Sequence, residues 1–249
     1  MLNKVICGDC LEVMKGIPDK SIDMILCDLP YGTTACKWDT VIPFEPLWAH
    51  YRRVIKDNGA IVLTASQPFT SALIMSNPKL FKYELIWEKE QGTGQLNAKK
   101  MPLKKHESIL IFSKAKLGNS TYNPQFTYGK PYSRNDIGKV NNTKEKVYGV
   151  SNGYEAHDIT TRYPTSIIRF NMVKTKGQHP TQKPVALFEY LIKTYTNEGD
   201  LVLDNCAGSG TTGVACKNTN RNYILIEKEP EYIDIINKRL NALNQDKLL

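Results

Sequence analysis

The sequence predicts an α/β fold built on a doubly wound, parallel sheet. Two observations predict it. Short apolar runs such as residues 22–27 have the continuous hydrophobicity of strands that are buried on both faces. They alternate with segments of helical periodicity, such as residues 44–55, where Leu47, Trp48 and Tyr51 recur on one face. Alternation of this kind is typical of a parallel sheet covered by helices.

The elements follow one another along most of the chain. Strands are expected at residues 4–7, 22–27, 60–65, 83–87, 108–112, 201–203 and 223–226, and helices at 11–17, 44–55, 68–76, 184–195, 211–216 and 230–240. The turn Asp57-Asn58-Gly59 is expected to end the helix at 44–55. Neither period persists between residues 114 and 165, where Gly, Asn, Ser, Thr, Lys and Tyr dominate. We therefore expect two halves of one domain, 1–113 and 166–249, separated by an insert at 114–165.

Composition and charge narrow the class of protein. A chain of 249 residues with 41% hydrophobic and 23% charged residues is expected to fold around one substantial core. No apolar run is long enough for a membrane helix, so a cytoplasmic location is expected. Residues 89–183 carry 17 Lys and Arg against 6 Asp and Glu, a net charge of +11, whereas the rest of the chain carries −3. This distribution favours a polyanionic partner on the middle segment.

The cysteine pattern predicts neither disulfides nor a metal site. Most of the six cysteines lie in or beside apolar runs, where a thiol behaves as a small hydrophobic group. Cys7-x-x-Cys10 has no second Cys or His pair at the spacing of a zinc site.

A glycine-rich turn between an apolar strand and a helix predicts a nucleotide-like ligand. It lies within residues 201–212 and contains Gly208 and Gly210, which allow close approach of the backbone to a ligand. Gly213 completes a Gly-x-Gly-x-x-Gly pattern, and Glu227 ends the next strand, as in dinucleotide-binding proteins. A nicotinamide-dependent oxidoreductase is therefore one hypothesis.

A second motif, Asp28-Leu29-Pro30-Tyr31, directly follows the apolar run 22–27. The carboxyl ends of parallel strands are where ligands bind in α/β sheets, so an acid and an aromatic residue here indicate a functional site. The alternative is a plain turn after a strand.

Together the motifs resemble those of amino-group DNA methyltransferases. Asp28-Leu29-Pro30-Tyr31 resembles their Asp-Pro-Pro-Tyr motif, residues 206–210 (Cys-Ala-Gly-Ser-Gly) their cofactor loop, and residues 179–184 (His-Pro-Thr-Gln-Lys-Pro) the segment before that loop. Asp9 matches a Gly-Asp that precedes the catalytic strand. The order of the motifs is similar to that of the circularly permuted beta class. The resemblance implies a Rossmann-like, circularly permuted S-adenosylmethionine methyltransferase sheet with a target-recognition lobe inserted at 114–165.

The resemblance also implies roles for individual residues. Asp28 and the carbonyl of Leu29 accept the hydrogens of the target amine, Pro30 fixes the backbone, and Tyr31 stacks on the extruded base. The cofactor residues that it implies are Asp9, Lys183, Asp204, Cys206, Gly208, Gly210, Thr211 and Glu227. Among these, Asp9 binds the cofactor's adenine amine, Lys183 its methionine carboxylate and Glu227 its ribose.

Two positions depart from the family pattern. Leu29 replaces the first proline of the catalytic motif but still supplies a backbone carbonyl. Asn205-Cys206 replaces the usual Pro-Phe, so an aromatic ring near the cofactor is absent, which is expected to alter affinity rather than reaction type.

The expected function is site-specific methylation of the N6 amine of adenine in double-stranded DNA, with S-adenosylmethionine as cofactor. N4-cytosine methylation is the nearest alternative, and Asp rather than Ser at position 28 favours adenine. A nicotinamide-dependent oxidoreductase and a non-enzymatic DNA-binding module are further alternatives. A homodimer and a cognate restriction endonuclease are both compatible with this expected function.

Overall fold

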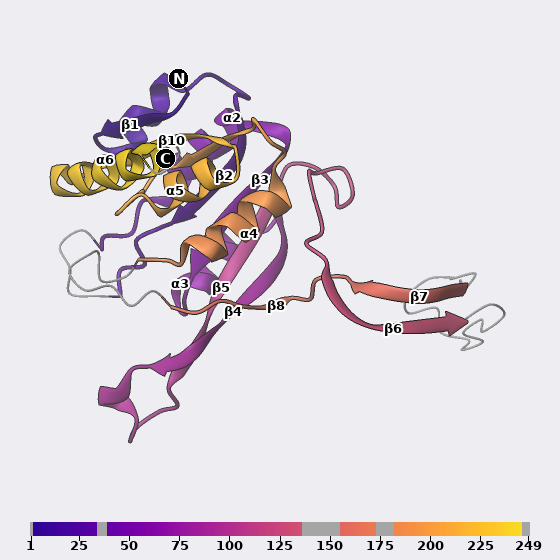
Figure 1. Ribbon diagram of the computed structural model, residues 1–249. Helices are drawn as coiled ribbons and strands as arrows, with labels where there is room; N and C mark the ends of the chain where they lie inside the picture. Colours follow the sequence, from indigo (N-terminus) through magenta and orange to yellow (C-terminus); the bar gives the residue numbers. More distant parts are fainter. Residues whose placement is uncertain (1, 34–38, 136–154, 173–181, 246–249) are drawn as a thin grey trace. The chain divides into compact units, whose positions relative to one another are not determined.

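The computed structural model describes residues 2–33, 39–135, 155–172 and 182–245 (Figure 1). The chain divides into two compact units, one formed by residues 1–123 and 166–249 and the other by residues 124–165. The first unit is built on an eight-stranded sheet with the order β1-β10-β9-β2-β3-β5-β4-β8. The second contains a two-stranded sheet, β6-β7.

The elements have the following bounds. The strands are β1 Lys4–Cys7, β2 Ile22–Asp28, β3 Ile55–Ala65, β4 Phe81–Thr93, β5 Lys104–Ser113, β6 Thr127–Asn135, β7 Glu155–Arg162, β8 Ile167–Arg169, β9 Leu201–Asp204 and β10 Asn222–Glu227. The helices are α1 Cys10–Val13, α2 Phe44–Val54, α3 Phe69–Ser76, α4 Val185–Tyr195, α5 Thr211–Asn218 and α6 Pro230–Gln245, and 3₁₀ turns occur at Met14–Gly16 and Gln95–Asn97. None of the helices in the described part of the chain has the length and apolar character needed to cross a membrane.

The central strands of the large sheet are buried on both faces because helices pack against each of them. Along β2, Ile25 and Cys27 join the cluster formed with α1, α2 and α3, whereas Met24 and Leu26 join the cluster formed with α4, α5 and α6. Successive side chains of a strand point to opposite faces, so a strand between two helical layers must be apolar throughout. This explains why residues 22–27 form an uninterrupted apolar run.

The chain reverses its direction of winding between β9 and β2. From β9 it passes through α5 to β10 on one side, and from β2 through α2 to β3 on the other. The two strands are neighbours in parallel register, with Met24 opposite Val202 and Ile25 opposite Leu203. A crevice forms where the strand order reverses in this way, at the carboxyl ends of the strands, and ligands bind there.

The prediction of a doubly wound α/β sheet covered by helices is confirmed, and the one difference is that the sheet is mixed rather than parallel throughout. β5 runs antiparallel to both β3 and β4. The reason lies in the connection from β4 to β5, which is a short loop without a crossover helix, and such a loop joins antiparallel strands. The weakly patterned strand β8, which pairs with β4, was not predicted.

Two local predictions were also wrong. The residues Asp57, Asn58 and Gly59 do not follow the helix as a stop signal but lie inside β3, at a bulge where the register shifts between Ile22 and Met24. The ion pair of Lys56 with Asp23 at 2.6 Å fixes that bulge. The helix expected at 11–17 is a single α-helical turn followed by a 3₁₀ turn.

The second unit has regular structure that the sequence did not indicate. β6 and β7 pair antiparallel, with Thr127 opposite Arg162. The Arg162 guanidinium lies 4.3 Å from the ring centre of Tyr132 and donates a hydrogen bond to the carbonyl of Lys130 at 2.6 Å. The expectation of an insert without strands at 114–165 is therefore corrected, because irregular pairing with two register shifts obscures the alternation of a strand.

Candidate active site

A cavity of about 620 Å³ lies where β2, β9 and β10 end. This volume is within the range of small-ligand sites, roughly 300 to 1,000 Å³. Eleven of the twelve residues predicted to form the site line it: Asp9, Asp28, Leu29, Pro30, Tyr31, Lys183, Asp204, Cys206, Gly208, Thr211 and Glu227. Of the motif at 179–184, residues 179–181 lie outside the described residues.

Gly210 is the predicted site residue that does not line the cavity. It has φ +81°, a left-handed conformation that favours glycine, and a Cβ added there would lie 2.9 Å from a methylene of Ile236. Its amide donates to the carbonyl of Ala207 at 2.7 Å, which closes the turn before α5. Gly210 therefore shapes the loop and lets α6 pack closely. Gly213 has a similar packing role, because a Cβ there would meet Leu225 at 2.7 Å.

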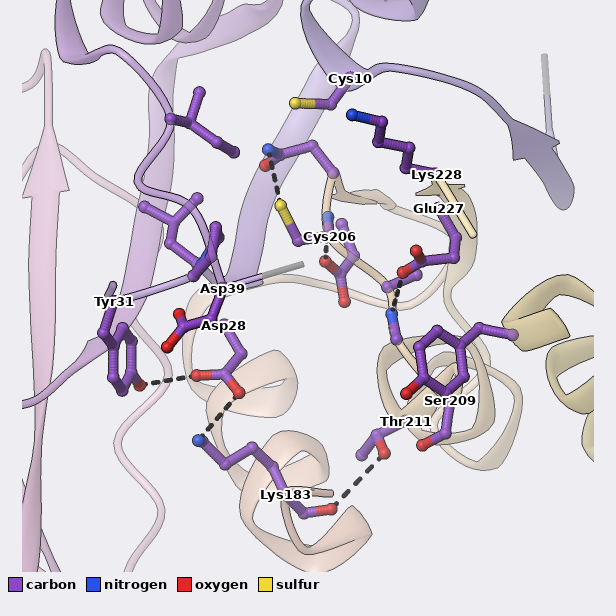
Figure 2. A pocket seen from close by; sticks show the side chains of 18 of the residues that line it. Cys10, Asp28, Tyr31, Asp39, Lys183, Cys206, Ser209, Thr211, Glu227 and Lys228 are labelled. Atoms are coloured by element: carbon purple, nitrogen blue, oxygen red, sulfur yellow. Dashed lines mark hydrogen bonds and ion pairs between the residues drawn. The ribbon is translucent and has the colours of Figure 1, made fainter. Parts of the chain in front are cut away.

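Asp28 is held by donors on both of its carboxylate oxygens (Figure 2). The hydroxyls of Tyr31, at 2.7 Å, and of Thr64 both donate to Oδ1. The Lys183 ammonium lies 2.9 Å from Oδ2. A carboxylate has about four acceptor positions, two on each oxygen. Within the described residues, the second position on Oδ2 is left for a ligand.

Lys183 links Asp28 to a second partly buried acid. Its Nζ lies 3.2 Å from Oε2 of Glu107, whose other oxygen pairs with Lys89. Burial by itself lowers the pKa of Lys183, but Asp28 and Glu107 outweigh it and raise the pKa well above the usual value. Burial likewise acts to raise the pKa of Glu107, and the two lysines reverse this and lower it. Lys183 and Glu107 are therefore held in their charged forms by the partners that lie next to them.

Glu227 fixes the conformation of the glycine-rich loop. Its Oε2 accepts a hydrogen bond from the amide of Gly208 at 2.7 Å, and its Oε1 one from the amide of Glu229 at 2.9 Å. Burial raises its pKa, and these amides oppose the shift. The carboxylate thus lies at the cavity wall with acceptor positions still available to a hydroxyl-bearing ligand.

Asp9 and Cys206 border the same cavity from different sides. Asp9 caps α1 by accepting from the amide of Leu11 at 2.9 Å, and its side chain is exposed. The thiol of Cys206 accepts from the amide of Asn205 at 3.5 Å, and Asn205 in turn accepts from the buried hydroxyl of Tyr51 at 2.6 Å. The pair Asn205-Cys206 therefore anchors the loop to α2.

Three functional candidates escaped the sequence analysis: Thr64, Lys89 and Glu107. Each comes from a strand next to β2 or beyond it, and the pairing of Asp28 with Thr64 across β2 and β3 places the hydroxyl beside the carboxylate. A signal did exist for the other two, because Lys89 and Glu107 interrupt or border apolar strand runs where a charge must find a buried partner. Which charges pair depends on the sheet order, which the sequence does not reveal.

Comparisons with known proteins show the family to which this chain belongs. Residues 22–238 match the DNA methylase family of N6 and N4 methyltransferases, and the chain belongs to this family. It is 29% identical to the Type II methyltransferase M.HpaI of Haemophilus parainfluenzae over 97% of this chain and 75% of that protein. The crystal structure of an M1.HpyAVI–SAM complex matches 95% of this chain and 99% of its own with a TM-score of 0.61 and 28% identity. The cytosine-N4-specific PvuII DNA methyltransferase matches in fold, with a TM-score of 0.63 over 97% of this chain and 93% of its own at 17% identity.

The protein is thus an S-adenosylmethionine-dependent DNA methyltransferase of the N6/N4 family. This confirms the expected reaction class and cofactor and decides against the nicotinamide-dependent oxidoreductase. The residues present fit the cofactor: the cavity has sufficient volume, the Glu227 carboxylate suits ribose hydroxyls, and the Lys183 ammonium has a third N–H donor for a carboxylate.

Asp204 gives a pH-dependent prediction. It ends β9, accepts from the Cys206 amide at 3.1 Å and from the Thr212 hydroxyl, and is almost completely buried. Burial raises its pKa to about 7, and these hydrogen bonds offset the effect only in part. In the unfolded chain an aspartate has a pKa of about 3.9. Between these values the folded state binds more protons, so this residue lowers stability as the pH rises.

We predict that Asp204→Asn removes this loss. The unfolding free energy of the wild type, relative to the variant, should fall on the order of 2 to 4 kcal/mol between pH 4 and pH 7. Denaturant unfolding across that range measures it, with Asp234→Asn on the exposed side of α6 as control for the loss of one charge. A difference that stays constant with pH would show that folding does not raise the pKa of Asp204.

Proposed function

We propose that this protein is a beta-class, circularly permuted methyltransferase that methylates the N6 amine of adenine within a short sequence of double-stranded DNA. The observation that carries the proposal is the open acceptor position of Asp28 at Oδ2, in the same cavity as the glycine-rich loop and Glu227. Asp at position 28 rather than Ser favours adenine over cytosine as the target.

The target amine is a weak nucleophile because its lone pair is delocalised into the base. If Oδ2 of Asp28 and the carbonyl of Leu29 accept its two hydrogens, the nitrogen can pyramidalise and direct its lone pair out of the ring plane. The Leu29 side chain is buried in the core, and Pro30 has no N–H, so the backbone carbonyl is held in place by a well-packed turn. The site thus acts by positioning and by electrostatic assistance.

When bound, S-adenosylmethionine supplies the electrophilic methyl group. Glu227 is proposed to accept hydrogen bonds from ribose hydroxyls, Asp9 from the adenine amine, and Lys183 to donate its remaining N–H to the methionine carboxylate. Lys183 would then join the cofactor to Asp28, because its ammonium already contacts that carboxylate.

Tyr31 is proposed to receive the extruded base, since a methyl group cannot reach an exocyclic amine that is stacked inside a duplex. Phe69 backs the ring, with the two centres 5.3 Å apart and the planes inclined by 27°. The hydroxyl donates to Asp28 and lies 3.0 Å from Thr64. A ring fixed at its edge and on one face is a rigid platform for stacking on the other.

Sequence recognition is assigned to the insert at 114–165, whose compact part is the unit 124–165. The exposed ring of Tyr128, at 82% exposure, supports this, together with the half-buried Arg162 beside Tyr132. Tyrosine and arginine contact bases and phosphates in many DNA complexes. The similarity to Type II methyltransferases also makes a cognate restriction endonuclease a proposed partner, and a homodimer stays a prediction.

The proposed reaction is tested by expressing the protein in cells whose DNA lacks modification, then sequencing that DNA and analysing its nucleosides by mass spectrometry. We expect N6-methyladenine at one short sequence. Asp28→Ala should lower turnover on the order of a hundredfold or more, because the acceptor for the amine is lost, while cofactor affinity by calorimetry changes little. Asp234→Ala is the matched control. Detection of N4-methylcytosine instead would show that the target base is cytosine. DNA without any modification would overturn the proposal.

The assignment of the insert predicts that specificity moves with it. Replacing residues 114–165 by the corresponding segment of a family member with another target should transfer that target sequence, because the cofactor motifs lie on either side of the insert. Calorimetry with S-adenosylmethionine verifies that the hybrid still folds and binds cofactor. A folded hybrid that methylates the original sequence would place recognition elsewhere in the chain.

A further inference from the structure

The β4–β5 hairpin extends well past the catalytic edge of the large sheet (Figure 1). The registers of the paired strands define how far the hairpin extends beyond the level of Asp28. Asp28 is opposite Thr64, Thr64 opposite Ile109, and Ile109 opposite Leu85. Strand β4 continues for eight more residues to Thr93, which corresponds to roughly 25 Å at about 3.3 Å per residue. The end of the hairpin therefore projects from the same edge of the sheet as the site.

The stem of this hairpin forms part of the cavity wall. Lys89 and Thr93 of β4 and Glu107 of β5 all line the cavity. Glu88, on the outer side, pairs with Lys105 at 3.2 Å and with Arg169 at 2.6 Å. Two acids of the stem, Glu88 and Glu107, are thus paired with cations close to them.

The hairpin tip, residues 94–103, is ordered by its own hydrogen bonds. The amide of Asn97 donates to the carbonyl of Gly94 at 2.9 Å, and the amide of Met101 to the carbonyl of Asn97 at 3.0 Å. The side chain of Gln95 donates to the carbonyl of Gly92 at 2.8 Å. These contacts give the tip a defined shape before it meets any partner, which lowers the entropic cost of binding.

The tip exposes basic and apolar side chains and no acid. Residues 91–106 contain four lysines and neither Asp nor Glu. Lys99 and Lys100 are exposed, and in the described part of the chain no carboxylate pairs with either of them. Leu96 is 99% exposed and Met101 59%. Exposed apolar side chains indicate a contact surface, and lysines without paired acids favour a negatively charged partner. Together they indicate a surface for a polyanion that also has apolar parts.

We propose that the hairpin tip is a second DNA contact, separate from the recognition insert. Lys99 and Lys100 bind phosphates beside the target site, and Leu96 inserts into a groove at the base step that opens when the target base leaves the stack. This inference rests on the proposed function, because it names how the substrate of that same site is held.

Contacts made by the tip would lower the free-energy cost of extruding the target base. Removing a base from the duplex breaks stacking and pairing, and an apolar side chain inserted between base steps offsets part of that cost. Phosphate contacts from lysines fix the register of the protein on the duplex. A rigid hairpin that is continuous with the cavity wall couples these contacts to the position of the target base.

The lysines are tested by Lys99→Gln/Lys100→Gln on a duplex that contains the methylated sequence found in vivo. The slope of log affinity against log salt should become less negative by about 2, about 1 for each lysine that no longer binds a phosphate. The matched control is Lys4→Gln/Lys79→Gln, which removes two exposed lysines at the opposite edge, where β1 and β4 begin. The control should keep the wild-type slope.

Leu96 is tested by Leu96→Ser, with Met75→Ser as control, because Met75 is 72% exposed on α3. Methylation of the matched duplex by Leu96→Ser should fall on the order of tenfold. A duplex with an abasic site opposite the target should restore the rate towards that of the wild type, since little extrusion cost remains. A merely structural defect would lower the rate on both duplexes.

The outcomes separate this proposal from the proposed function. A wild type that methylates no DNA would overturn the proposed function itself. An active wild type whose tip variants match their controls in salt slope and in rate would overturn only the assignment of the tip. A Leu96→Ser variant that changes the sedimentation of the protein but not its methylation rate would instead make the tip a contact between protein chains, and would also overturn the proposal.

Discussion

The parallel pairing of β2 with β9 is the interaction on which the site depends. Met24, Ile25, Val202 and Leu203 are fully buried where the two strands meet, although they come from opposite ends of the sequence. Since both faces of these strands pack against helices, a slip of one residue would turn every side chain to the wrong layer. The register therefore fixes the level at which both strands end, and with it the place where Asp28 meets the glycine-rich loop.

A set of ion pairs between two buried lysines and two partly buried acids connects the strand ends to the outer strands of the sheet. Lys183 joins Asp28 to Glu107, and Lys89 completes the set with equal numbers of positive and negative groups. A buried ion without its partner is strongly unfavourable, so each member holds its neighbours in place. Because Glu107 and Lys89 belong to the β4–β5 hairpin, the same ion pairs connect the catalytic carboxylate to the element that we propose as a DNA contact.

Much of the fold could be predicted from local pattern, and the misses have a common physical cause. Residues 22–27 could be predicted because burial on both faces leaves an uninterrupted apolar run, and residues 44–54 because burial of one helical face leaves a clear period. The Asp57-Asn58-Gly59 bulge, the antiparallel β5 and the β6–β7 hairpin depend on pairing partners distant in sequence. The site motifs were visible because they are contiguous, whereas Thr64, Lys89 and Glu107 meet Asp28 or Lys183 only through the sheet. Gly210 was found through the loop motif, but the motif did not indicate that its role is to allow close packing of Ile236.

We infer that one cavity brings the cofactor beside the carboxylate that accepts the target amine. A crystal structure of this protein with S-adenosylmethionine bound tests it most directly. We expect the ribose hydroxyls to contact Glu227, the methionine carboxylate to contact Lys183, and the sulfonium methyl to face Asp28 across an open space large enough for a base. A cofactor that binds outside this cavity, or with its methyl group directed away from Asp28, would show that the carboxylate and the methyl donor do not meet in this site.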